Sequence, residues 1–126
     1  MRWMIAAVAA TVLAGCATGI QPGGEYPSQT FTVPLSYQEA YRRADAQARE
    51  CAHNMAVTGE LFTDNQTGVV RVNAPTLSAD LLRVSLRAVS ESATEATVTA
   101  SNEGQFDGGQ VIAMRQSIET GTPVCR

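Results

Sequence analysis

The sequence predicts an α+β fold, with two layers: an antiparallel sheet of about five strands and two helices on one of its faces. Several segments alternate apolar and polar residues, which is the period of a strand with one solvated face. Two other segments repeat apolar residues every three or four positions, as amphipathic helices do. The predicted order is β-α-β-β-β-β-α, and strands grouped beside helices are typical of α+β domains.

The first strand is expected over residues 30–33, after a segment of different composition. Residues 16–29 are rich in Gly, Pro and Ser and show no period, so they predict a flexible spacer. Phe31 and Val33 share one face of the strand, and Pro34 limits it. The sequence therefore predicts one folded domain over residues 30–126.

The first helix is expected over residues 37–53. Ser36 and Glu39 have the spacing of a capping box, in which each side chain bonds the backbone N–H of the other residue. His53 suits the C-terminal end of this helix. The expected inward stripe consists of Tyr37, Ala40, Tyr41, Ala44, Ala48, Cys51 and Met55. Off the stripe lie Arg42, Arg43, Asp45, Gln47, Arg49 and Glu50.

Two hairpins are expected next. Residues 60–63 and 69–73 flank the turn-rich segment 64–68, and residues 82–88 and 95–101 flank a second turn. In the second hairpin the expected inward residues are Leu82, Val84, Leu86, Ala88, Ala96, Val98 and Ala100. The expected outward residues are Arg83, Ser85, Arg87, Glu95, Thr97, Thr99 and Ser101.

The second helix is expected over residues 110–120. Asp107 is the expected N-cap, and Gly121 followed by Pro123 gives the usual stop signal. The expected apolar set of this helix is Val111, Ile112, Met114 and Ile118.

The N-terminus has the layout of a secretory signal. Arg2 carries a positive charge, and residues 3–15 carry none. This run is shorter than the ~18 residues that a membrane-spanning helix needs. It ends in Leu13, Ala14, Gly15 and Cys16, which resemble the lipobox of bacterial lipoproteins. On these residues the chain resembles the small outer-membrane lipoproteins of proteobacteria.

This resemblance implies that Cys16 is the attachment site of a lipid. Its thiol would carry diacylglycerol, residues 1–15 would be removed, and the new amino group of Cys16 would be acylated. Two or three acyl chains anchor a protein stably in a membrane. Ala17 in place of Asp after the cysteine favours the outer membrane, on its periplasmic face. The alternatives are an ordinary signal peptide with Ala-x-Ala cleavage and a short buried helix.

Two cysteines, Cys51 and Cys125, remain once Cys16 is assigned to the lipid. Compartments outside the inner membrane are oxidising, so we expect a disulfide between them. A redox pair, a metal pair and two free thiols are the alternatives. The lone His53 is insufficient for a zinc site of standard spacing, and the sequence predicts no metal and no cofactor other than the covalent lipid.

Charge excludes one class of partner. The chain has nine Arg, no Lys and twelve acidic residues, and its net charge is −3. Removal of Arg2 with the signal would make residues 16–126 more acidic, at −4. An acidic protein is a poor candidate for binding nucleic acid.

No constellation of catalytic residues is recognisable, so we expect a protein without enzymatic activity that acts through contacts with another envelope protein. The alternative is a binding or inhibitor module. Arg83 and Arg87 would stand on the solvated sheet face, joined by Arg71, and arginine suits the recognition of carboxylate or phosphate groups. A solvated face with cross-strand pairs such as Arg87 with Glu95 is the simpler interpretation of the same residues.

Overall fold

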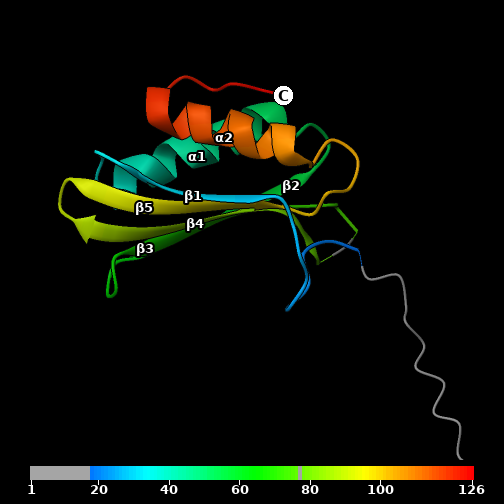
Figure 1. The fold of residues 1–126 in the computed structure, drawn as a ribbon, viewed down its shortest axis with the longest axis horizontal. Coiled ribbons are helices and arrows are strands. Elements are labelled where there is room, and N and C mark those ends of the chain that lie inside the picture. The colour runs from blue at the N-terminus through cyan, green and yellow to red at the C-terminus, as the bar shows by residue number, and fades with distance from the viewer. Residues whose placement is uncertain (1–17, 77) are drawn as a thin grey trace, which may run out of the picture.

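The computed structural model describes residues 18–76 and 78–126, and the predicted signal and lipobox lie outside these ranges. It confirms the α+β fold and the order of its elements. These are β1 (Ser28–Val33), α1 (Tyr37–Cys51), β2 (Ala56–Phe62), β3 (Thr67–Asn73), β4 (Asp80–Ser90), β5 (Ala93–Ala100) and α2 (Gly108–Thr120). The sheet is antiparallel with the strand order β1-β5-β4-β3-β2, and both helices cover the same face of it (Figure 1).

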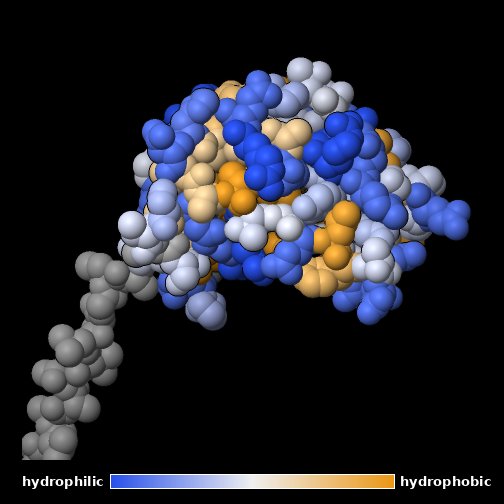
Figure 2. Space-filling model, turned by 180° about the vertical axis from the view of Figure 1, so that it is seen from behind, coloured by the Kyte–Doolittle hydropathy of each residue, from blue (hydrophilic) through white to orange (hydrophobic). Residues whose placement is uncertain are grey.

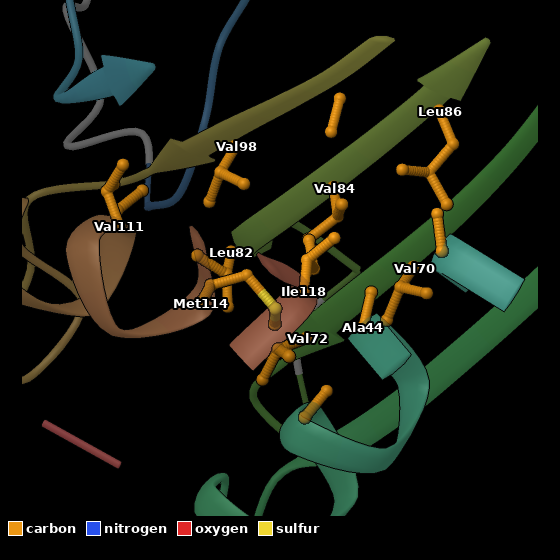
Figure 3. Packing of buried hydrophobic residues seen from close by; sticks show 14 of the residues in the cluster. Ala44, Val70, Val72, Leu82, Val84, Leu86, Val98, Val111, Met114 and Ile118 are labelled. Carbon is orange, nitrogen blue, oxygen red and sulfur yellow. The ribbon is translucent and has the colours of Figure 1, made fainter. Parts of the chain in front are cut away.

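The core lies between this face and the two helices. The alternating residues of β4 and β5 that were expected inward are buried, for example Leu82 at 1% exposed and Val98 at 0%, except Ala88, which is half-buried near the end of β4. From the helices, Ala44, Met114 and Ile118 point toward the valine and leucine side chains of the strands (Figure 3). Helix α1 contributes mainly small alanines to this core, and α2 contributes the longer side chains of Val111, Met114 and Ile118.

Helix α1 begins as predicted and ends earlier. Ser36 is the N-cap, and its hydroxyl accepts a hydrogen bond from the Glu39 amide at 3.2 Å. The predicted hydrogen bond from the Ser36 amide to the Glu39 side chain is wrong, because the Glu39 carboxylate binds Arg42 and Arg43 instead. The helix ends at Cys51, not residue 53, because the backbone of the next residue leaves the helical region.

Two residues of the helices were assigned to the wrong face. Gln47 was expected in solvent and is fully buried, and Ile112 was expected in the core and is 49% exposed. Helix α1 contacts both the sheet and the C-terminal tail, so a second side of it is covered. The Gln47 side chain uses this position to donate a hydrogen bond to the carbonyl of Val124 at 3.0 Å.

The strands of the first hairpin are longer than predicted. β2 begins at Ala56 and β3 at Thr67, so the connecting turn contains four residues, and Gln66 adopts a positive φ of 54° within it. β2 was underestimated because it is an edge strand whose residues are all exposed or half-buried, so the contrast between its two faces is weak. Ser101, expected to point outward after β5, is 6% exposed, and its backbone amide donates a hydrogen bond to the Leu81 carbonyl at 2.9 Å.

The C-terminal tail is fastened to α1 and α2. The predicted disulfide between Cys51 and Cys125 is present, with a Cα–Cα distance of 5.4 Å. The Val124 amide donates to the Ser117 hydroxyl at 2.8 Å. Arg126 forms a two-pronged ion pair with Asp107, the N-cap of α2. The tail thereby ties the end of the first helix to both ends of the second.

The segment before β1 is docked on the domain, which differs from the flexible spacer expected over residues 16–29. The Gly19 amide donates to the Glu103 carboxylate at 3.0 Å, and the Ile20 amide donates to the Asp80 carbonyl at 2.8 Å. The strand itself begins at Ser28, two residues before the expected start. Composition indicated a spacer because Gly and Pro break regular secondary structure. The same residues also permit tight turns, and this segment uses them to follow a compact path on the domain.

Candidate functional site

The predicted arginines all lie on the sheet face opposite helices α1 and α2. The strand register places Arg71 of β3 directly opposite Arg83 of β4. Arg87 lies four residues further along β4, about 13 Å away at the usual rise of a strand. The structure therefore brings two of the three arginines together and separates the third from them.

Arg71 and Arg83 share one carboxylate. The Asp80 Oδ2 atom lies 2.7 Å from the Arg83 guanidinium and 3.5 Å from the Nε of Arg71. Its other oxygen accepts a hydrogen bond from the Asn73 side chain at 2.9 Å. Asp80 is 6% exposed, whereas both arginines are about two-fifths exposed at their side chains. Two cations and one anion leave this cluster with a formal excess of one positive charge.

Asp80 joins this face because of an irregularity in the strand. Residues three apart in a regular strand point to opposite faces, so the sequence gives no reason to pair Asp80 with Arg83. The register shifts there: Val72 pairs with Leu82, and the next residue, Asn73, pairs with Asp80. Leu81 is therefore an extra residue, and this β-bulge turns Asp80 to the open face while Leu81 stays buried.

The cluster borders an open hollow of about 490 Å³ at the end of the sheet where β4 begins. Besides the two arginines and Asp80, its lining includes Asn73 and Ile20, a residue of the docked N-terminal segment. A small oxyanion could approach the guanidiniums here, but Asp80 already occupies part of their hydrogen-bonding capacity.

Arg87 forms the cross-strand pair with Glu95 that the simpler interpretation expected. The Arg87 Nη2 and Glu95 Oε2 atoms are 3.2 Å apart, and the arginine side chain is 60% exposed. Exposed pairs of this kind contribute little to stability. Toward β1 the open face continues in hydroxyl pairs, with 3.0 Å between the oxygens of Thr30 and Thr97. Most of this face is therefore polar and internally paired.

The other titratable groups considered from the sequence have structural surroundings. His53 is exposed in the turn after α1. Hydrogen bonds from Arg42 and then Arg43 lower the pKa of Glu39 to about 2. Burial raises the pKa of the Tyr41 hydroxyl, and the nearby Asp45 adds to that effect. In residues 18–76 and 78–126, no three His, Cys, Asp or Glu side chains are grouped to hold a metal ion.

None of the helices formed by the described residues has the length and apolar character needed to cross a membrane. A comparison of the sequence with protein-family models finds no matching family, and a search of curated proteins finds no relative.

Proposed function

We propose that this protein is a lipid-anchored lipoprotein of the bacterial cell envelope, held on the periplasmic face of the outer membrane through Cys16. The observation that carries the proposal is the bridge between Cys51 and Cys125. Such bridges persist in oxidising compartments, which fits export by a signal. The bridge also leaves Cys16, at the end of the lipobox pattern, as the one cysteine available for lipid.

In this proposal the protein acts through contacts with another envelope protein, without catalysis of its own. Large apolar side chains are exposed at the end of the sheet where both hairpins turn: Leu61 is 40% exposed, Phe62 44% and Val89 56%. The N-terminal segment binds at the opposite end of β4. An 11-residue strand is about 36 Å long, so the hairpin end is well separated from the anchor and accessible to a partner.

The anchoring claim is tested by replacing the lipid acceptor. The variant Cys16→Ser should move from the membrane fraction to the soluble periplasmic fraction, and the mature wild-type protein should carry the mass of diacylglycerol and an acyl chain. Cys125→Ala is the matched control, because it also removes a cysteine and should remain in the membrane fraction. Membrane retention of Cys16→Ser would contradict the proposal.

The contact claim is tested by crosslinking in intact cells. A photoreactive residue in place of Phe62 should give one discrete crosslinked species. The matched control is the same residue in place of Ile112, which is similarly exposed, at 49%, but lies on the solvent side of α2. Equal crosslinking at the two positions, or none at Phe62, would argue against a partner at the hairpin end.

A second candidate function is the binding of a small anion, and the excess positive charge of the Arg71, Arg83 and Asp80 cluster favours it. Titration with inorganic phosphate should shift the NMR signals of the two guanidiniums saturably, and Arg71→Gln should abolish the shift. Arg49→Gln, which removes an exposed arginine from α1, is the control and should leave it unchanged. Shifts that do not saturate would exclude a specific site.

A further inference from the structure

A second hollow lies at the end of the sheet where the N-terminal segment reaches the domain. Its volume is about 600 Å³, and four of the eight residues that line it have apolar side chains. They come from separate loops and strands, and they include Met55, Ala74, Leu81 and Phe106. Thr18, the first residue that the structure describes, also lines the hollow. Glu103, the one acidic residue among the described residues that line the hollow, accepts a hydrogen bond from the Gly19 amide.

The chain that follows Thr18 is held in a defined path. Gly19 has a φ of +85°, and a Cβ atom there would lie 2.6 Å from the Ala79 Cβ and 2.8 Å from the Asp80 carbonyl oxygen. Only glycine fits so close to the neighbouring backbone in this conformation. The Tyr26 hydroxyl accepts a hydrogen bond from the Gln21 amide at 2.7 Å and closes the segment into a compact loop. Residues 18–27 are therefore part of the domain surface.

This docking limits how far the domain can lie from a lipid on Cys16. Two peptide steps separate Cys16 from Thr18, and a fully extended chain covers at most about 3.6 Å per residue. The lipid-bearing residue is thus within about 7 Å of the rim of the apolar hollow. A spacer of 14 flexible residues, as composition indicated, would instead have allowed the domain to tumble at a distance from the bilayer.

We propose that the hollow formed by Met55, Ala74, Leu81 and Phe106 rests on the bilayer that holds Cys16, so that the domain sits on the membrane in one orientation. This inference depends on the lipidation proposed above. The occupant is the lipid surface itself, which the short connection keeps at a high effective concentration. No arginine is among the described residues that line the hollow, so apolar contact rather than charge holds it against the lipid. The hairpin end with Leu61 and Phe62 then faces away from the membrane.

The surface of the molecule is compatible with this orientation. Seen from behind, hydrophobic side chains form separate patches in a mostly hydrophilic surface (Figure 2). The apolar hollow and the exposed apolar hairpin residues belong to opposite ends of β4, so one can contact lipid while the other contacts protein.

Depth-dependent tryptophan fluorescence tests the proposal. The only tryptophan of the sequence, Trp3, lies in the proposed signal, so the mature protein would contain no tryptophan and an introduced one would report alone. The lipidated Gln105→Trp variant, with its probe at an exposed position beside the hollow, is reconstituted into vesicles of brominated phosphatidylcholine. We expect bromine in the acyl chains to quench most of its fluorescence, with no dependence on salt. The matched control is Glu91→Trp in the exposed β4–β5 turn, which should keep its fluorescence.

A spacer variant and a mass measurement separate the two proposals. Insertion of a flexible Gly-Ser segment between Ala17 and Thr18 should leave the lipid and vesicle binding unchanged but abolish the quenching at position 105. Lipidated, vesicle-bound Gln105→Trp protein without quenching, or quenching that survives the insertion, would overturn the seated orientation alone. Absence of lipid on Cys16 would instead overturn the proposed function on which this inference rests.

Discussion

Removal of the bridge between Cys51 and Cys125 should lower the free energy of unfolding by about 4.4 kcal/mol. The two cysteines are 74 residues apart, and the chain-entropy relation assigns that amount to a closed loop of this length. A domain of this size is stabilised by roughly 5–15 kcal/mol in total, so the bridge accounts for about 30% of that free energy or more. At an unfolding entropy of about 2.1 cal/mol/K per residue, the expected fall in Tm is roughly 20 °C.

The assay is urea unfolding of the oxidised protein and of the double variant Cys51→Ala, Cys125→Ala. Cys125 is exposed, so reductant should convert the wild-type protein to the stability of the variant. The slope of the free energy against urea should rise without the bridge, because the unfolded chain then exposes more surface. Arg126→Ala is the control, since it removes the ion pair of the tail and keeps the bridge, and it should cost at most about 1 kcal/mol.

The reasoning fails if the double variant loses no more stability than Arg126→Ala. That result would mean that the hydrogen bonds of Val124 already hold the tail and that the bridge adds no constraint to the unfolded chain.

Three further predictions concern the core, the first helix and the N-terminal segment. Met114→Ala should cost about 2–5 kcal/mol in urea unfolding, because Met114 is fully buried between helix and sheet. Glu39 has a pKa lowered from 4.5 to about 2, so its contribution is present above pH 4.5 and lost as the pH falls toward 2. In thermal melts, the deficit of Glu39→Gln at pH 7 should therefore vanish near pH 2. Gly19→Ala should undock the N-terminal segment, seen as faster hydrogen exchange of the Ile20 amide with the global Tm preserved.

The sequence was most informative where one face of an element is buried and the other is solvated. The alternation in β4 and β5 identified Val84 and Val98 as core residues, because the period of a strand leaves no other arrangement for them. Helix α1 was equally clear from its stripe and its Ser36 cap. The pairing of Cys51 with Cys125 followed from simple counting once Cys16 was set aside.

Features that depend on irregular backbone or on distant segments were not predictable. The bulge at Leu81 has no composition signal, and without it the carboxylate of Asp80 could not reach Arg83. Gln47 is buried only because the C-terminal tail returns over α1, which a helical period cannot reveal. The docking of Gly19 likewise depends on Glu103, a residue 84 positions away.

The sheet order β1-β5-β4-β3-β2 also determines when the domain can complete its folding. β2 to β5 form a meander in which each strand pairs with its neighbour in sequence, so they can assemble through short loops. Among the strands that the structure describes, β1 pairs with β5 alone, and its partner residues lie more than sixty positions later. In a chain synthesised or exported from its N-terminus, β1 therefore stays unpaired until β5 has emerged. The disulfide between Cys51 and Cys125 can form only later, once the C-terminal tail has emerged as well.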